Sequence, residues 1–186
     1  MAMDYPVPVL PRPTLLRDGL VLALILAVGL LDQSTKFLVQ RFMEFGESIP
    51  AEGFIRLTYV VNPGAAFGLF QGQTLFLTVG SFLGIGVLVL FYYRAPLPGA
   101  LLRLSLGLQL GGAIGNLLDR LRMGEVVDFV DVGPWPIFNV ADSAIVVGIG
   151  LLMALVIFTD LWGVRRVPLS PLVPHPPDGA PPRVGC

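Results

Sequence analysis

Long uncharged apolar runs constrain this chain more than any other feature. Residues 74–93 contain no charge, and they match the roughly 20 residues that an α-helix needs to cross the hydrocarbon core of a bilayer. Hydrophobic residues make up 54% of the 186 residues and charged residues only 13%, where soluble domains carry roughly 25% charge. So few charges could not cover the surface of a soluble fold, so the sequence predicts an integral membrane protein.

Three further apolar segments complete a prediction of four membrane-spanning helices. They cover residues 15–39, 101–118 and 139–162. The first needs Asp32 and Lys36 near one end to reach spanning length. An alternative for it is a cleaved signal peptide, because small residues follow its basic flank and apolar run. Glycines spaced four residues apart predict close helix packing: Gly107, Gly111 and Gly115 in the third segment, and Gly80 and Gly84 in the second.

Two proline-rich ends flank the helical part, which we place at residues 15–162. Residues 1–14 are predicted to form an extended arm. Residues 163–186 contain seven prolines and are predicted to be a disordered tail, because proline breaks helices.

The charges on the two sides of the membrane predict the orientation. Four spans place both termini on one side, which together with the 94–103 loop carries seven basic and four acidic residues. The opposite side carries five basic and nine acidic residues. Because basic loops stay in the cytoplasm, we expect cytoplasmic termini and extracytoplasmic segments at 40–73 and 119–138. Residues 55–61 are rich in β-branched and aromatic residues, which predicts a small β structure on the outer surface.

The histidine and cysteine content excludes several kinds of site. His175 and Cys186 are the only residues of their type, and both lie in the proline-rich tail. They cannot form a disulfide framework, a zinc site of the usual nitrogen and sulfur type, or an HExxH metalloprotease motif. The location of the single histidine in this tail also argues against a Ser-His catalytic triad. The net charge of −1 argues against a nucleic-acid partner, and we expect neither a metal nor an organic cofactor.

The polar residues collect at the predicted outer ends of the spans. Polar groups in a membrane are costly unless they are paired or solvated, so they are functional candidates by default. The candidates are Asp32, Lys36, Asn62, Asn116, Asp119, Arg120, Asp128, Asp131, Asn139 and Asp142.

Several of these candidates also have a purely structural interpretation. Asp32 and Lys36 are spaced to form an ion pair on one helix face. Arg120 suits a helix C-terminus, and Asp119 beside it needs a partner. Asn139 could cap the fourth helix, with Asp142 at the third helical position.

Asp128 is harder to explain structurally, because valines and a phenylalanine surround it in sequence and disfavour its charged form. Two neighbouring aspartates cannot both ionise cheaply. The ionised one can take a proton from water while the protonated one supports a carbonyl oxygen and then the leaving amine. A pair such as Asp128 and Asp142 therefore permits peptide hydrolysis without histidine or metal.

Five motifs in order resemble the lipoprotein signal peptidases, the bacterial signal peptidase II family. They are Asp32-Gln33-Ser34-Thr35-Lys36, Asn62-Pro63-Gly64-Ala65-Ala66-Phe67-Gly68, Gly115-Asn116-Leu117-Leu118-Asp119-Arg120, Val126-Val127-Asp128-Phe129 and Phe138-Asn139-Val140-Ala141-Asp142-Ser143. The resemblance covers roughly residues 15–162. It implies an aspartic endopeptidase of the bacterial inner membrane, with four transmembrane helices, a small extracytoplasmic β cradle and a short helix on the outer face.

The resemblance also implies roles for individual residues and partners. Asp128 and Asp142 would be the catalytic pair. Asn62, Asn116, Arg120 and Asn139 would bind the substrate, and Asp32, Lys36 and Asp119 would support the site. The substrates would be prolipoproteins, cut before a diacylglyceryl-modified cysteine, with membrane lipids as further partners and globomycin as an inhibitor.

Two other functions remain open from the residues alone. A small transporter subunit could use Asp32, Asp128 and Asp142 as ion sites, but a pathway needs polar groups at every depth of the membrane. A non-catalytic assembly protein would leave the paired acids unexplained.

Overall fold

The computed structural model describes residues 18–64, 72–94 and 99–161. Within these ranges it contains four helices and three strands: α1 (Gly19–Phe42), β1 (Ser48–Ile49), β2 (Arg56–Asn62), α2 (Thr74–Arg94), α3 (Ala100–Met123), β3 (Val126–Asp131) and α4 (Val140–Leu161). The predicted arm, the predicted tail and residues 65–68 of the second motif lie outside the described residues.

All four helices are long and apolar enough to cross a membrane, which confirms the four predicted spans. The main difference is in α3, which continues to Met123 instead of ending near residue 118. It ends where Gly124 adopts a left-handed conformation with φ of 80°, which favours glycine. Asp119 and Arg120 therefore belong to the last turns of the helix and not to the following connection.

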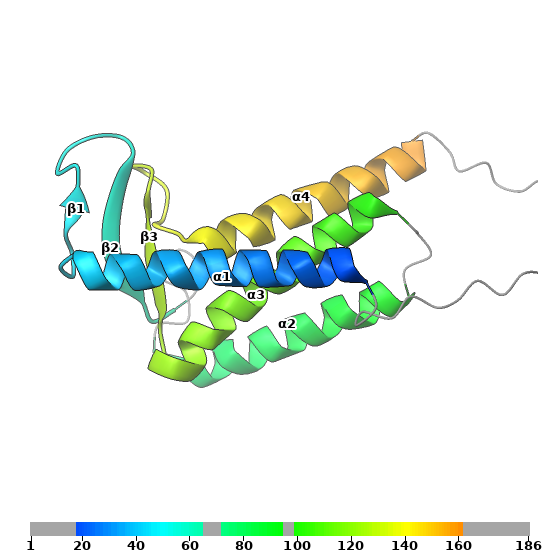
Figure 1. Ribbon diagram of the computed structural model, residues 1–186, viewed down its shortest axis with the longest axis horizontal. Coiled ribbons are helices and arrows are strands. Elements are labelled where there is room, and N and C mark those ends of the chain that lie inside the picture. Colours follow the sequence, from blue (N-terminus) through cyan, green and yellow to red (C-terminus); the bar gives the residue numbers. More distant parts are fainter. Residues whose placement is uncertain (1–17, 65–71, 95–98, 162–186) are drawn as a thin grey trace, which may run out of the picture.

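α3 occupies the centre of the bundle and packs against the other three helices. The sheet lies at one end of the bundle, whereas the start of α1 and the end of α4 lie at the other end (Figure 1). Most large apolar side chains of α1, α2 and α4 are exposed in the isolated chain. This distribution is expected for helices that face lipid, because a bilayer solvates apolar surfaces.

Glycines allow α1 to approach α3 closely, as the sequence predicts. A Cβ built at each of three α3 glycines would lie 2.6–2.8 Å from an α1 side chain. The facing pairs are Gly107 with Leu24, Gly111 with Val28, and Gly115 with Asp32. The same prediction is wrong for α2, because no atom of the described residues lies within 4 Å of a Cβ built at Gly80 or Gly84.

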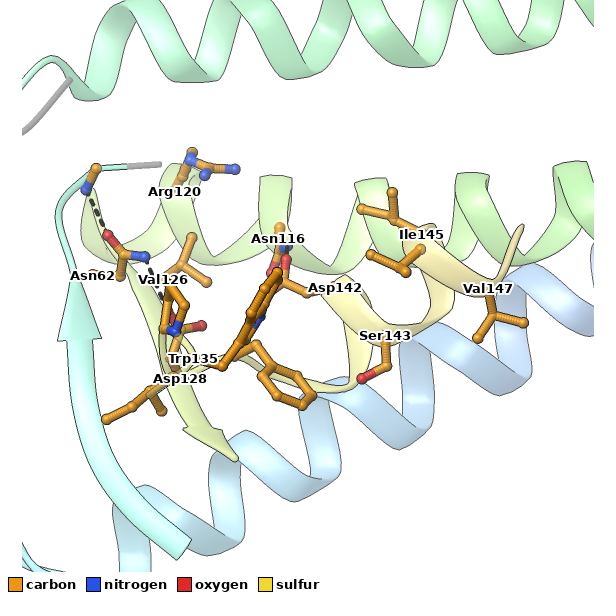
Figure 2. A pocket seen from close by; sticks show the side chains of 15 residues that line it. Asn62, Asn116, Arg120, Val126, Asp128, Trp135, Asp142, Ser143, Ile145 and Val147 are labelled. Carbon is orange, nitrogen blue, oxygen red and sulfur yellow. Dashed lines mark hydrogen bonds between the residues drawn. The ribbon is translucent and has the colours of Figure 1, made fainter. Parts of the chain in front are cut away.

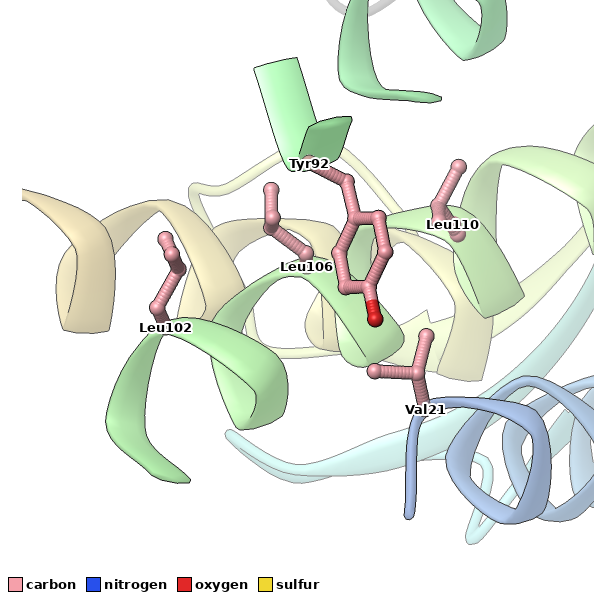
Figure 3. Packing of buried hydrophobic residues seen from close by; sticks show 5 residues of the cluster. All are labelled: Val21, Tyr92, Leu102, Leu106 and Leu110. Carbon is pink, nitrogen blue, oxygen red and sulfur yellow. The ribbon is translucent and has the colours of Figure 1, made fainter. Parts of the chain in front are cut away.

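A hydrophobic cluster stabilises the end of the bundle that is remote from the sheet. Figure 3 shows its members, which come from α1, α2 and α3: Val21, Tyr92, Leu102, Leu106 and Leu110. Asp18 closes this end, because it accepts a hydrogen bond of 2.9 Å from the Tyr92 hydroxyl and forms an ion pair of 2.9 Å with Arg103. The first three helices are thereby joined at the end remote from the candidate site.

The antiparallel sheet has the order β1-β2-β3. Its middle strand β2 confirms the predicted β structure, while β1 and β3 were not predicted. The side chains of β3 are almost all buried, so its sequence lacks the alternation that identifies a half-exposed strand. The described residues at the sheet end of the bundle contain no helix other than the four spans, so the short outer helix that the resemblance implies is not found among them.

Candidate active site

Strand pairing brings Asn62 to Asp128. Val60 on β2 lies opposite Asp128 on β3, and Asn62 follows two residues later on the same strand. The Asn62 amide donates a 3.0 Å hydrogen bond to Asp128 Oδ2, and its oxygen accepts one from the backbone of Gly64 (Figure 2). The turn after β2 therefore orients the amide that contacts the aspartate.

The fourth helix brings Asp142 to the same place. The side-chain oxygen of Asn139 accepts a 2.9 Å hydrogen bond from the backbone N–H of Asp142, and Asp142 Oδ2 accepts one of 3.3 Å from the backbone N–H of Asn139. This reciprocal pair forms a capping box, which confirms the predicted cap. The other Asp142 oxygen accepts a 2.7 Å hydrogen bond from the Asn116 side chain.

Asn139 connects the two aspartates. Its side-chain nitrogen donates a 2.7 Å hydrogen bond to Asp128 Oδ1, while its oxygen caps the helix that carries Asp142. Asp128 and Asp142 each accept hydrogen bonds on both carboxylate oxygens, all of them from amide groups. Amide groups carry no charge, so they do not neutralise either carboxylate. The site therefore keeps two acidic groups of like charge close enough to interact.

The environment of Asp128 favours its protonated form. Its side chain is almost fully buried, and this desolvation, followed by the nearby charge of Asp142, raises the pKa of Asp128 to about 6. The amides of Asn62 and Asn139 and the charge of Lys36 act in the opposite direction. A carboxyl group with such a pKa can gain and lose a proton near neutral pH, as acid–base catalysis requires.

A cavity of about 560 Å³ lies beside the two aspartates. Asn62, Asn116, Arg120, Asp128 and Asp142 all line it, together with apolar residues of the 135–138 segment and α4 (Figure 2). It therefore combines a few polar groups with a largely apolar wall, which is typical of ligand sites.

A second hollow, of about 510 Å³, lies between α2, α3 and α4. Asn116, Arg120 and Asp142 line both hollows. The side chains that line the second hollow belong to three predicted spans, so the site extends from the sheet towards the membrane-facing helices.

Arg120 is the cation of the site. Its guanidinium donates a 3.4 Å hydrogen bond to Ser81 on α2, and the described part of the chain offers it no carboxylate within ion-pair distance. An arginine that lines a cavity without such a partner can donate to a substrate carbonyl.

A buried ion cluster, formed by Asp32, Lys36 and Asp119, lies next to the site. The Lys36 ammonium lies 2.9 Å from Asp32 and 2.7 Å from Asp119, and it donates a 3.0 Å hydrogen bond to the Asn116 oxygen. The first contact confirms the predicted ion pair, and the second supplies the partner that Asp119 needs. Asp32 also accepts a 3.0 Å hydrogen bond from the backbone of Ala141 at the start of α4.

The structure brings together every residue that the sequence singled out, except Asp131. That residue lies farther along β3, where Thr58 donates to it at 2.9 Å and Arg56 at 2.6 Å. These hydrogen bonds, that of Thr58 above all, lower the pKa of Asp131, so it is a structural anion of the sheet.

Sequence reasoning gave no role to Gln33, which contacts the ion cluster, or to Ser81, which contacts Arg120. Only the position of Gln33 inside the first motif could have indicated it. Among the described residues, no group of three or more potential ligands could hold a metal ion.

Comparison with known proteins gives one consistent family. The family profile "Signal peptidase (SPase) II" matches residues 24–158. The chain is 50% identical over 133 residues to the "Lipoprotein signal peptidase" of Moorella thermoacetica, covering 70% of this chain and 88% of that protein. It is 52% identical over 134 residues to the protein of the same name from Pelotomaculum thermopropionicum, with 70% and 88% covered.

A solved structure described as "Bacterial membrane enzyme structure by the in meso method at 2.3 A resolution" has a TM-score of 0.73 and 31% sequence identity, covering 81% of this chain and 96% of that chain. The transporter alternative receives no support from these relatives, and the polar groups gather at one end of the bundle. The profile match, the identities and the shared fold together show that this chain belongs to the signal peptidase II family of membrane proteases.

Proposed function

We propose that this signal peptidase removes signal peptides from prolipoproteins and that Asp128 and Asp142 are its catalytic pair. The observation that carries the proposal is the placement of the buried Asp128 and the half-buried Asp142 beside one cavity. Each carboxylate is held by amides, and neither forms an ion pair with a cation of the described residues. The described residues contain neither a histidine nor a cysteine that could act as a base or a nucleophile, and Asp128 and Asp142 are the two carboxyl groups that line the cavity.

The proposed reaction uses the pair as acid and base. The ionised aspartate takes a proton from water, and the water oxygen attacks the scissile carbonyl carbon. The protonated aspartate donates its proton towards the carbonyl oxygen, which gives a neutral tetrahedral intermediate. The first aspartate then passes its proton to the leaving nitrogen as the carbon–nitrogen bond breaks, and the second recovers its proton from the intermediate. Either aspartate can hold the shared proton, because coupled carboxyls titrate as a pair.

The neighbouring polar residues would bind the substrate backbone. Arg120 can donate to the carbonyl oxygen on which negative charge develops. Asn62 and Asn116 line the cavity and donate hydrogen bonds to the two carboxylates, and the fully buried Asn139 holds Asp128 in place from behind the cavity wall. Asp32, Lys36 and Asp119 support Asn116 and the start of α4.

The site is proposed to lie at the outer face of the bacterial inner membrane, with both chain ends in the cytoplasm. The charge distribution supports this orientation through the positive-inside rule. Exposed apolar side chains lie on β2 and in the connections that precede β1 and β2, among them Phe45, Phe54, Ile55 and Leu57. Such side chains can rest on acyl chains, which contributes roughly 25 cal/mol per Å² removed from water.

A diacylglyceryl group on the substrate cysteine would hold the scissile bond at the membrane surface beside the aspartates. Anchoring of this kind reduces the entropic cost of bringing a bond to its catalytic groups. Membrane lipids are the natural surroundings of this site, and globomycin is proposed as an inhibitor that occupies it.

The proposal is tested by incubating the purified protein in detergent with a prolipoprotein, with and without its diacylglyceryl group. We expect a shortened product whose kcat/KM is much higher for the lipidated substrate. Asp128→Asn and Asp142→Asn should each remove cleavage, whereas Glu125→Gln, an exposed acid beside β3, should not. Equal kcat/KM for the two substrates would refute lipid recognition, and full turnover by either aspartate variant would refute the catalytic pair.

A further inference from the structure

The side-chain amide of Gln33 makes hydrogen bonds through both its nitrogen and its oxygen. Its nitrogen donates to Asp119 Oδ1 at 2.8 Å, to Asp32 Oδ2 at 3.2 Å and to the carbonyl of Gly115 at 3.3 Å. Its oxygen accepts a 2.9 Å hydrogen bond from the Arg122 guanidinium. One half-buried side chain of α1 thus joins both carboxylates of the ion cluster to the last turns of α3.

Arg122 determines which way this amide points. A guanidinium group can only donate hydrogen bonds, so it requires the amide oxygen and turns the amide nitrogen towards the carboxylates. The carboxylates, which accept hydrogen bonds, require the same orientation. The exposed Arg122 therefore fixes a donor that faces the buried side of the cluster.

The cluster needs a neutral donor because its charges do not balance. Two carboxylates, Asp32 and Asp119, surround the single ammonium of Lys36. A buried excess of negative charge is costly unless hydrogen bonds stabilise it. The Gln33 nitrogen stabilises both carboxylates without adding another charge, which a lysine or a glutamate at this position would do.

Asn116 connects Lys36 to Asp142. Lys36 donates to the Asn116 oxygen at 3.0 Å, and this leaves the Asn116 nitrogen to donate to Asp142 at 2.7 Å. Movement of either carboxylate would move the ammonium, which sets the orientation of the Asn116 amide together with the Asn139 side chain, a second donor to the same oxygen at 3.2 Å.

We propose that Gln33, oriented by Arg122, is a positioning residue for Asp142, acting through the ion cluster and Asn116. The inference rests on the proposed function, because Asp142 must be catalytic for its orientation to affect turnover. Gln33 itself makes no contact with the cavity beside the aspartates, so it acts on the geometry of the pair and not on the binding of substrate.

The test compares Gln33→Met with Gln40→Met in the cleavage assay. Gln40 is a matched control, because it lies on the same helix and also contacts α3, through Met123 at 3.4 Å, but is exposed. We expect Gln33→Met to lower kcat about tenfold with KM changed less than about twofold, the pattern of a lost transition-state interaction. Gln40→Met should match the unmodified protein in both constants.

A double-mutant cycle separates positioning from a loss of stability. If Gln33 acts through Asn116, then Gln33→Met combined with Asn116→Ala should turn over no more slowly than Asn116→Ala alone. Additive losses would overturn the inference, as would a Gln33→Met variant with normal kcat. Absence of cleavage by the unmodified protein would instead refute the proposed function.

The exposed Arg122 gives a second test that leaves the buried packing intact. Arg122→Lys keeps a donor for the Gln33 oxygen and should retain kcat, whereas Arg122→Met should lower it in the same direction as Gln33→Met. Equal kcat for the two Arg122 variants would contradict the orienting role of Arg122.

Discussion

Replacing Lys36 by methionine would remove the positive charge at the centre of the ion cluster and leave two carboxylates unbalanced. The side chains of Lys36, Asp32 and Asp119 are 3%, 0% and 4% exposed, so water cannot replace the lost ammonium. Breaking a buried ion pair by removing one partner costs about 3–5 kcal/mol.

This cost sets the size of the expected effect. For a chain of this length, each kcal/mol lowers the melting temperature by about 2–4 °C, so Lys36→Met should melt roughly 6–20 °C below the unmodified protein. The measurement is heat-induced loss of helical circular dichroism in detergent micelles. Arg41→Met is the matched control, because Arg41 is an exposed basic residue on the same helix.

A compensating variant shows whether charge is the cause. Adding Asp32→Asn and Asp119→Asn to Lys36→Met removes every charge of the cluster, and most of the lost melting temperature should return. The reasoning is refuted if Lys36→Met melts within about 2 °C of Arg41→Met, or if the uncharged triple variant is the least stable of the set.

The remaining predictions concern helix packing, protonation and orientation. Gly112→Ala should lower the free energy of unfolding by about 1–3 kcal/mol, because its Cβ would strike the carbonyl oxygen of Ala141, whereas Gly150→Ala, with open space around it, should not be destabilising in the same melting assay. Because the folded pKa of Asp128 is raised to about 6, its carboxyl contributes stability at low pH that is lost as the pH rises through about 6. Relative to Asp128→Asn, the unmodified protein should therefore lose about 2–3 kcal/mol between about pH 4 and about pH 7, and a constant difference would mean an ordinary pKa. A cysteine at the exposed Phe45 should react with a membrane-impermeant thiol reagent in intact cells while Cys186 does not, and labelling of Cys186 alone would reverse the orientation.

Local patterns in the sequence were sufficient for much of this architecture. Charge-free length predicts α2, and glycine spacing predicts the close contact of α3 with α1. The Asp32–Lys36 pair and the cap formed by Asn139 with Asp142 each depend on residues three or four positions apart. Such contacts follow from helix geometry alone, so no tertiary information is needed to predict them.

Features that depend on distant segments were not predictable in the same way. β3 lacks alternation because both of its faces are buried. Gly80 and Gly84 have the spacing of a packed face, but no described atom lies within 4 Å of a Cβ at either position, and Gly84 lines the hollow between α2, α3 and α4. The glutamine of the first motif contacts residues more than eighty positions away, and no local pattern indicates which acids it will meet.

The central claim is that Asp128 and Asp142 act as one catalytic unit, and the double variant tests it most directly. The measurement is the single-turnover rate of lipidated prolipoprotein cleavage with the enzyme in excess, for Asp128→Asn, Asp142→Asn and both together. Groups that act as a unit are not additive, so the account predicts that the double variant is no slower than the slower single variant. A double variant whose rate falls by the product of the two single losses would contradict the claim, because each aspartate would then contribute independently.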